Sequence, residues 1–287
     1  MRVLVFGAGV IGRIYAARLA LAGNQVVLVA RGSAATTQAK GIRIHAIGER
    51  ERTVRVPIVA DASEAGDVDI AFLAVRRDQL DAAMPDFARI RSRLVVSLID
   101  IPRGLPEFRK LIGPARFIPA FPGVAGSVSD DGVVNFIDVR QQPTTVEDAP
   151  ATAEVVGLLE EAGFRTATVP NMDSWLQTHV IFITAFEAAI VRVGGDVASL
   201  ARDYDAVHDV VVEVRRGLRA LTARGVQVSP TSLKTIFIRM PLWFATRYWM
   251  RQLAGPLGRF GFRPHAMKSQ HTELPAFLED VHALTGL

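Results

Sequence analysis

The chain has 287 residues, enough for a large buried core and about two domains. Hydrophobic residues make up 49% of the sequence and charged residues 22%, which excludes an intrinsically disordered protein. The formal net charge of +4 is small and the basic residues are scattered, which argues against a nucleic-acid partner and for an anionic cofactor or substrate. Because cysteine is absent, disulfides, thiolate chemistry and cysteine-based metal sites are excluded.

A glycine-rich turn follows the first predicted strand, residues 3–6, and opens a helix-like stretch that leads to a second strand at residues 25–29. Gly7 permits the tight turn, Gly9 lets the backbone approach a pyrophosphate, and Gly12 allows the helix to pack closely on the strand. The phosphates are expected at the helix N-terminus, where free N–H groups and the positive end of the helix dipole face them. The alternative is a strand-turn-helix unit that binds no dinucleotide.

The end of the second strand distinguishes two dinucleotides. In NAD-binding proteins a carboxylate stands about 20 residues after the glycines and holds the ribose hydroxyls. Here no Asp or Glu precedes Glu49, and Arg31 occupies that place. A guanidinium attracts a 2′-phosphate, and Ser33 can donate a further hydrogen bond, so the sequence predicts NADP. The alternative for Arg31 is a solvated loop arginine.

Strand-like and helix-like segments alternate through the first half, which is typical of a doubly wound, Rossmann-type parallel sheet. We expect residues 41–45 and 53–59 to form an antiparallel excursion around a polar turn. Further strands are expected at residues 68–75, 94–99, 117–121, 133–139 and 165–169, and helices at residues 79–90 and 151–162.

The pattern changes at Asn171. Helices are expected near residues 172–192, 203–224, 230–252 and 266–284, with Gly- and Pro-containing turns between them. The predicted organisation is therefore an NADP-binding Rossmann-type domain at residues 1–169 and an all-α substrate or dimerisation domain at residues 170–287. Ligands of such sheets bind beyond the carboxyl ends of the strands, so the substrate is expected between the two domains.

Several segments resemble the ketopantoate reductase (2-dehydropantoate 2-reductase) family. They are Val5-Phe6-Gly7-Ala8-Gly9-Val10-Ile11-Gly12, Leu28-Val29-Ala30-Arg31, Phe72-Leu73-Ala74-Val75-Arg76-Arg77-Asp78-Gln79, Phe121-Pro122-Gly123, Asp131-Gly132-Val133-Val134 and His271-Thr272-Glu273-Leu274. The resemblance implies NADPH-dependent reduction of a 2-oxo acid, with Arg76 and Gln79 close to the cofactor and Glu273 binding the substrate. The predicted cofactor residues are Gly7, Ala8, Gly9, Val10, Ile11, Gly12, Arg31, Ala74, Val75, Arg76 and Asp100. Asp100 is expected at the nicotinamide ribose, although a loop aspartate also serves as a turn or cap residue.

The resemblance fails at the family's catalytic helix. That helix carries a proton-donating lysine and asparagines four and eight residues later, all on one face. Here Gln177 replaces the lysine, Ile181 and Ala185 replace the asparagines, and Asp100 stands where the family has asparagine. A neutral amide can hydrogen-bond a carbonyl oxygen but cannot supply a proton at neutral pH.

Three explanations remain open for the missing lysine. In the first, another residue donates the proton, and His271 and Lys268 are favoured over Lys234 and His179. In the second, water or a substrate group acts as the acid for a different substrate. In the third, the protein binds NADP(H) without turnover, as a sensor or scaffold. The catalytic candidates are therefore Glu273, His271, Lys268 and Gln177. The alternative for Glu273 is a solvated glutamate at a helix start.

Aromatic and arginine side chains alternate near residue 245. The cluster comprises Phe237, Trp243, Phe244, Tyr248 and Trp249, with Arg239, Arg247 and Arg251. A pocket wall, a subunit interface or a membrane-surface contact would each fit, but we favour a core-facing helix with its arginines in water.

Partners and location follow from what the sequence lacks. No run of 18 uncharged apolar residues occurs, and the most apolar stretch, residues 180–193, contains Glu187 and Arg192. We expect no membrane or nucleic-acid partner, no signal peptide, no metal site, a cytoplasmic location and a small-molecule oxo acid or carbonyl substrate. A homodimer is one expectation for the assembly.

Overall fold

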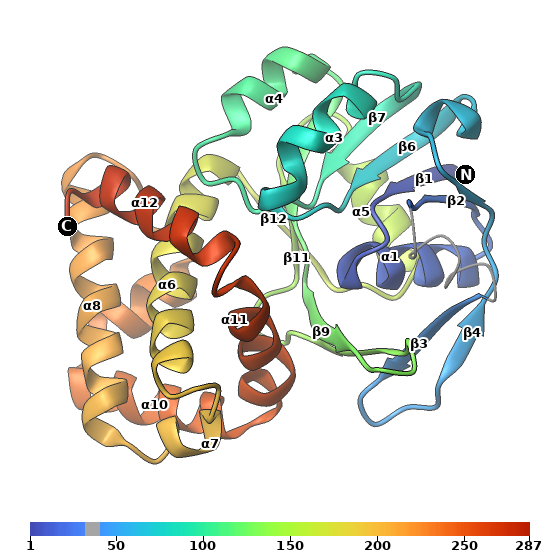
Figure 1. The fold of residues 1–287 in the computed structure, drawn as a ribbon. Coiled ribbons are helices and arrows are strands. Elements are labelled where there is room, and N and C mark those ends of the chain that lie inside the picture. Colours follow the sequence, from blue (N-terminus) through green and yellow to red (C-terminus); the bar gives the residue numbers. More distant parts are fainter. Residues whose placement is uncertain (32–40) are drawn as a thin grey trace. The chain divides into compact units, whose positions relative to one another are not determined.

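The computed structural model describes residues 1–31 and 41–287, so Ser33 lies outside the described residues. These residues form two compact units. The first comprises residues 1–100 and 104–170, and the second comprises residues 101–103 and 171–287. Figure 1 shows a sheet with covering helices in the first unit and a bundle of helices in the second.

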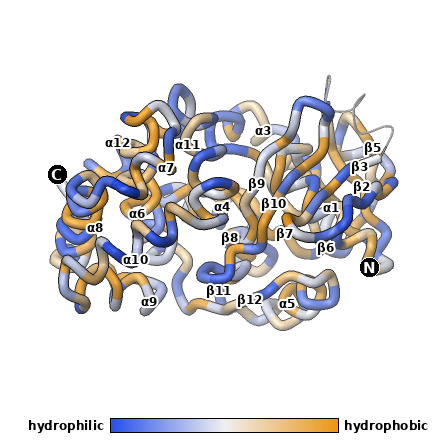
Figure 2. The backbone as a smooth tube through the Cα atoms, turned by 90° about the horizontal axis from the view of Figure 1, so that it is seen from below, coloured by the Kyte–Doolittle hydropathy of each residue, from blue (hydrophilic) through white to orange (hydrophobic). Residues whose placement is uncertain are grey.

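An eight-stranded sheet forms the centre of the first unit, in the order β12-β11-β8-β7-β6-β1-β2-β5. Its strands are β1 (Arg2–Phe6), β2 (Gln25–Val29), β5 (Ile58–Val59), β6 (Val68–Leu73), β7 (Ser92–Ser97), β8 (Phe117–Phe121), β11 (Thr144–Glu147) and β12 (Thr166–Val169). Neighbouring strands are parallel except β8 and β11. The inner strands are buried on both faces and read as nearly continuous apolar runs (Figure 2). The predicted doubly wound sheet is confirmed.

Four helices cover this sheet: α1 (Val10–Leu21), α3 (Leu80–Phe87), α4 (Leu105–Ile112) and α5 (Thr152–Glu161). Helices α1 and α5 share one face, where Tyr15 stacks on Phe164 at 4.3 Å between ring centroids. Helices α3 and α4 lie on the opposite face, with Phe87 and Phe108 in contact (Figure 1). Two 3₁₀ turns, η1 (Ala62–Ala65) and η2 (Arg77–Gln79), complete the connections.

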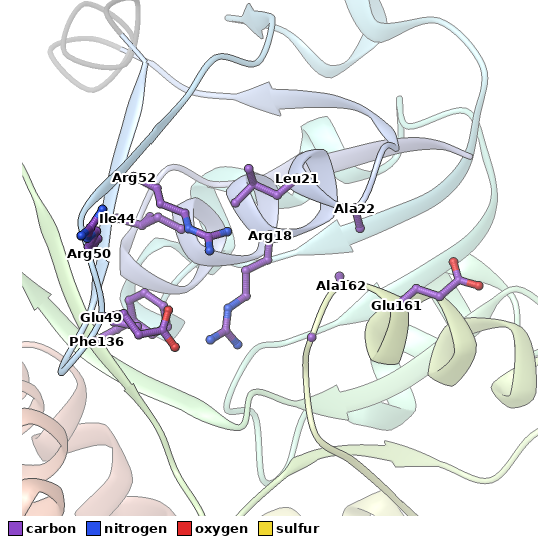
Figure 3. Close-up of a pocket in the computed structure, with 12 residues that line it drawn as sticks. Arg18, Leu21, Ala22, Ile44, Glu49, Arg50, Arg52, Phe136, Glu161 and Ala162 are labelled. Atoms are coloured by element: carbon purple, nitrogen blue, oxygen red, sulfur yellow. The ribbon is translucent and has the colours of Figure 1, made fainter.

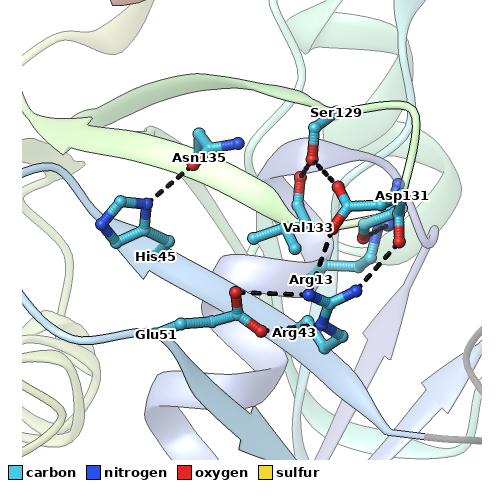
Figure 4. Close-up of polar contacts among 9 residues, drawn as sticks. Arg13, Arg43, His45, Glu51, Ser129, Asp131, Val133 and Asn135 are labelled. Carbon is cyan, nitrogen blue, oxygen red and sulfur yellow. Dashed lines mark hydrogen bonds and ion pairs between the residues drawn. The ribbon is translucent and has the colours of Figure 1, made fainter.

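A second sheet in this unit has the order β4-β3-β10-β9, with β3 (Ile42–Ala46), β4 (Arg52–Val54), β9 (Val124–Val128) and β10 (Val134–Asp138). Ion pairs join its strands and turns, since Arg43 contacts Glu51 at 2.7 Å and Asp131 at 3.1 Å (Figure 4). On the neighbouring strands, Nδ1 of His45 lies 2.8 Å from Oδ1 of Asn135. The apolar side chains of both sheets belong to one core.

The structure corrects several sequence expectations in this unit. The strand expected at residues 53–59 is divided at Pro57, and its second part, β5, pairs with β2 in the main sheet. Proline has no N–H for a strand ladder, which explains the interruption. The antiparallel pairing of β3 with β4 is as expected. Helix α4 and strands β9 and β11 were not predicted from the sequence.

The second unit is helical. Its α-helices are α6 (Met172–Arg192), α7 (Val197–Leu200), α8 (Tyr204–Ala223), α9 (Thr231–Lys234), α10 (Leu242–Ala254), α11 (Arg263–Ser269) and α12 (Glu273–Thr285). Two π-helical segments, η3 (Thr235–Arg239) and η4 (Leu257–Phe262), lie between them. The helix expected at residues 230–252 is wrong as a single element, because Pro241 interrupts it. The helix expected at residues 266–284 is also divided, into α11 and α12.

Aromatic rings fill the core of the second unit around α6. Phe186 stacks on Phe262 at 5.4 Å, and Phe237 stacks on Trp249 at 5.5 Å. Helix α6 is long and apolar enough to cross a membrane, but 78% of its most apolar window is buried in the protein. Such burial is characteristic of the core helix of a globular unit.

The expected core-facing cluster near residue 245 is only partly correct. Phe237 and Trp249 are buried, with 0% and 5% of their surface exposed. Trp243 and Phe244 are instead 55% and 41% exposed, so the expectation is wrong for these two side chains. The break at Pro241 starts α10 in a new rotational phase, which turns Trp243 and Phe244 outward.

His179 is buried within α6. Its ring stacks on Trp175, with 5.0 Å between centroids and 11° between planes. Burial, and after it the positive charge of His265, lowers the pKa of His179 to about 3. The imidazole is therefore neutral in the folded protein at neutral pH and remains neutral well into the acid range.

Replacing His179 tests whether its imidazole is buried, because burial makes the free energy of unfolding depend on pH. Below pH 6.5 the unfolded chain protonates His179 while the folded chain does not, so the free energy of unfolding falls as the pH falls toward 3. Between pH 6.5 and 4.5 this single group removes about 2 kcal/mol of stability. His179→Phe keeps the stack on Trp175 and should lose that part of the pH slope in urea unfolding. His208→Phe should keep it, and parallel slopes for His179→Phe and the wild type would contradict the assignment.

Candidate cofactor and catalytic sites

The glycine loop after β1 has one part that is tightly packed and one that is open. A Cβ atom on Gly7, where φ is +110°, would lie 2.6 Å from the carbonyl oxygen of Ala74. A Cβ atom on Gly12 would lie 1.8 Å from the carbonyl oxygen of Gly7. A Cβ atom on Gly9 would meet nothing within 4 Å. Gly7 and Gly12 therefore bring backbone against backbone, while Gly9 borders open space.

Helix α1 begins beside that open space. Gly9 is its N-cap and provides no side-chain cap, and the first turn contains no acidic residue. The first N–H groups of a helix have no partner within the helix, and its dipole is positive at this end. Ala8, Val10 and Ile11 are half-buried, and Gly9 among them is exposed. This arrangement fits the pyrophosphate of a dinucleotide.

Other predicted cofactor residues lie at the same edge of the sheet. Strands β1 and β6 are parallel neighbours in register Phe6 to Leu73, and the N–H of Ala74 donates to the carbonyl oxygen of Phe6 at 2.8 Å. Ala74, Val75 and Arg76 therefore follow β6 directly beside the glycine loop. Asp100 follows β7, the next strand along. This point is where the strand order reverses, the usual ligand position in doubly wound sheets.

The two residues that the family resemblance places near the cofactor interact with each other. Nη2 of Arg76 lies 2.6 Å from Oδ2 of Asp78, and the backbone N–H of Arg76 donates to Oε1 of Gln79 at 3.3 Å. Gln79 thus supports the turn that carries Arg76. Part of the positive charge of Arg76 is balanced by Asp78.

Arg31, at the end of β2, is held by a buried carboxylate. It forms an ion pair with Asp86 of α3, whose side chain is 6% exposed, while the Arg31 side chain is 53% exposed. Its Nε also donates to the carbonyl oxygen of Ala60 at 3.4 Å. Arg31 is therefore a partly solvated arginine that an ion pair holds in place, and its exposed part is available to an anion.

Asp86 also contacts Arg89, which lies 2.9 Å from Asp61. Hydrogen bonds from Ser63, followed by the charges of Arg89 and Arg31, hold the pKa of Asp61 below its ordinary value. Sequence reasoning missed this network. Asp86 is separated from Arg31 by 55 positions, so no local pattern connects them.

In the second unit the predicted catalytic residues differ in exposure. Gln177 is half-buried on α6, and Ile181 and Ala185 are buried where the family has asparagines. Lys268 on α11 and His271 in the following turn are exposed. Glu273, the first residue of α12, is only 6% exposed, so it is not the solvated glutamate of the alternative interpretation.

A polar cluster that the sequence did not predict lies between α6 and α11. Glu187 is fully buried, and its Oε2 accepts a hydrogen bond from Oγ of Ser269 at 2.9 Å. Its Oε1 contacts Nδ1 of His265, whose side chain is half exposed. The sequence signal was the single carboxylate inside the apolar stretch 180–193. Both carboxylate oxygens of Glu187 are therefore held by side chains of α11.

The cavity of about 350 Å³ in Figure 3 lies elsewhere in the first unit. It is bordered by Arg18 and Leu21 of α1, by Ile44 and Phe136 of the second sheet, and by Glu161. Arg18 is held by Asp138 at 2.7 Å. None of the predicted site residues lines this cavity, so it is not the candidate site.

The sequence comparisons decide the family. The family model described as ketopantoate reductase PanE/ApbA matches residues 3–146. The chain belongs to the ketopantoate reductase family. A 2-dehydropantoate 2-reductase of Mesorhizobium japonicum is 35% identical over 108 residues. That match covers 37% of this chain and 32% of the relative, so it spans about a third of the relative's length.

Solved structures share the whole fold of this ketopantoate reductase family member. The 2-dehydropantoate 2-reductase of Geobacter metallireducens GS-15 has a TM-score of 0.78 at 14% identity, covering 100% of this chain and 93% of that one. A D-mandelate dehydrogenase solved with NADH and anilino(oxo)acetate has a TM-score of 0.69 at 15% identity, covering 100% and 98%. At these identities the likeness establishes the fold alone.

The two glycines of the loop are expected to respond differently to substitution. Gly12→Ala forces a methyl group onto the Gly7 carbonyl and should lower the free energy of unfolding by about 3 kcal/mol. Gly9→Ser places its side chain in open space at a helix N-cap and should change it by only a few tenths of a kcal/mol. Urea unfolding of both variants measures the difference, and equal destabilisation would contradict the described loop.

Proposed function

We propose that the protein is an NADPH-dependent oxidoreductase that reduces a small 2-oxo acid or a related carbonyl compound. The main support is the open glycine loop at the N-terminus of α1 in a chain of the ketopantoate reductase family. The D-mandelate dehydrogenase of the same fold was solved with a nicotinamide dinucleotide and an oxo acid derivative, which supports this class of substrate. A cytoplasmic location and a homodimer stay predictions.

The first unit would hold the dinucleotide through groups at one sheet edge. Backbone N–H groups of residues 7–12 would bind the pyrophosphate, and Asp100 would accept a hydrogen bond from the nicotinamide ribose. The exposed part of Arg31 would bind a 2′-phosphate, with Asp86 keeping the guanidinium in place. Arg76 would add a second positive charge at the end of β6.

Reduction of a ketone requires a hydride and a proton. A bound dinucleotide would supply the hydride. The half-buried amide of Gln177 can donate a hydrogen bond to the carbonyl oxygen but cannot protonate it. We assign the proton to Lys268 or His271, which are exposed and can be recharged from solvent, with the buried carboxylate of Glu273 accepting from the substrate or holding the cation.

A substrate screen tests the proposal as a whole. Purified protein is mixed with NADPH and a panel of 2-oxo acids, ketones and imines, and the loss of NADPH absorbance is followed. Turnover with at least one oxo acid or ketone is expected. Tight NADPH binding without turnover on any compound would overturn the enzyme assignment in favour of a sensor or scaffold.

The cofactor preference depends on Arg31. Arg31→Ala should weaken NADPH binding by roughly 10- to 100-fold, the loss expected for a charge-assisted contact with phosphate, and should leave NADH binding nearly unchanged. Isothermal titration calorimetry with both dinucleotides measures the effect. Arg91→Ala, which removes an exposed arginine paired with Asp67, serves as the matched control. Equal losses for NADPH and NADH would contradict the role of Arg31.

The proton donor can be identified by kinetics. We expect either Lys268→Met or His271→Gln to lower kcat by about 10²- to 10⁴-fold while NADPH affinity stays constant, because only the proton transfer is lost. Lys234→Met, which removes the remaining lysine of the helical unit, is the control. If both variants keep kcat within twofold of the wild type, the acid lies elsewhere, and His265 beside Glu187 becomes the group to test.

A further inference from the structure

Helix α10 presents an aromatic pair to solvent. Trp243 is 55% exposed and Phe244 is 41% exposed, and their rings lie edge to face with 5.8 Å between centroids. Exposed aromatic side chains of this size are unusual on a water-facing surface when they adjoin one another. Neither residue belongs to the proposed cofactor or catalytic groups.

The pair shares one face of the helix with two arginines. Successive helical residues are separated by about 100°, so Trp243, Arg247, Arg251 and Phe244 fall within an arc of about 100°. All four side chains are exposed. The opposite side of the helix is buried and consists of Ala245, Thr246, Trp249 and Leu253. We call the four exposed residues the α10 face.

The chain around this face is strongly basic. Between Glu213 and Glu273 the sequence contains no Asp or Glu. The basic residues of that stretch are Arg215, Arg216, Arg219, Arg224, Lys234, Arg239, Arg247, Arg251, Arg259, Arg263 and Lys268. A partner that carries anionic groups and accepts two aromatic rings therefore fits the α10 face.

The α10 face is held in position from beneath. Arg215 of α8 donates hydrogen bonds to the carbonyl oxygens of Phe237 and, at 2.6 Å, of Met240, immediately before α10 begins. Thr246 Oγ1 donates to the carbonyl oxygen of Leu242 at 2.8 Å within the first turn. The aromatic pair is thus presented by an anchored helix and not by a loose segment.

We propose that the α10 face docks on the surface of an anionic lipid bilayer. Tryptophan and phenylalanine enter the boundary between head groups and acyl chains, and arginines beside them contact lipid phosphates. A second copy of this chain fits less well, because a twofold contact would bring the same positively charged face against itself. The expectation of no membrane partner depended on the lack of a spanning segment, which a peripheral contact does not require. The proposal is independent of the proposed oxidoreductase activity.

Vesicle binding tests the docking directly. The full chain is sedimented with vesicles of phosphatidylcholine alone and with vesicles of equal parts phosphatidylcholine and phosphatidylglycerol. Binding is expected only to the anionic vesicles, and it should weaken with added salt. Trp175 and Trp249 are 2% and 5% exposed, so a blue shift of tryptophan emission on binding reports Trp243.

Paired variants separate the α10 face from general charge or hydrophobicity. Trp243→Ser with Phe244→Ser, and separately Arg247→Gln with Arg251→Gln, should each lower vesicle affinity at least tenfold while circular dichroism stays unchanged. The controls are Leu278→Ser, which removes a 47% exposed apolar residue on α12, and Arg91→Gln in the first unit. Neither control should change vesicle binding.

Three results would overturn the proposal. The first is no sedimentation of the wild type with anionic vesicles, and the second is an equal loss of binding in the control variants. The third is a wild-type dimer in size-exclusion chromatography that becomes monomeric in both α10 double variants without any lipid effect, which would assign the face to a second copy of the chain.

Discussion

The close approach of two backbone segments determines how this protein can meet a ligand. Just beyond the ends of β1 and β6, a side chain on Gly7 would collide with the carbonyl oxygen of Ala74. A side chain on Gly12 would collide with the carbonyl oxygen of Gly7. These contacts set the first turn of α1 directly beyond the strand ends. A side chain on Gly9 would meet only open space, and the first N–H groups of a helix have no partner within it, which supports our proposal of a pyrophosphate there.

Buried carboxylates hold basic side chains in place in both units. Asp86 contacts both Arg31 and Arg89, and Glu187 contacts His265 and Ser269. Burying a carboxylate without such partners would destabilise the fold. Each contact therefore fixes the position of the basic side chain and also compensates the buried carboxylate. In the family the catalytic helix supplies a lysine, whereas this chain has Gln177 at that position. The charged groups of α11 and its following turn are therefore the remaining sources of a proton in our proposal.

The sequence predicted an element accurately where the element depends on residues close together in the chain, and less accurately where it depends on distant ones. The glycine loop, β8 and the extent of α6 depend on neighbours a few residues apart, and the sequence located them closely. Strand β11 was not predicted, because three of its four residues are polar and it pairs with β8 and β12, which are distant in the sequence. The helices expected at residues 230–252 and 266–284 were drawn too long, since apolar periodicity continued across Pro241 and across the turn before Glu273.

The sequence by itself determined the doubly wound sheet, the glycine loop with its arginine and the loss of the family's lysine, because these depend on residue types at short spacing. Only the tertiary structure decided that Asp86 holds Arg31, that Glu273 and Glu187 are buried, and that Trp243 and Phe244 face solvent. Each of these facts depends on contacts between residues that are distant in the chain or on the rotational phase of a helix after a break. Local propensity carries no information about either of them.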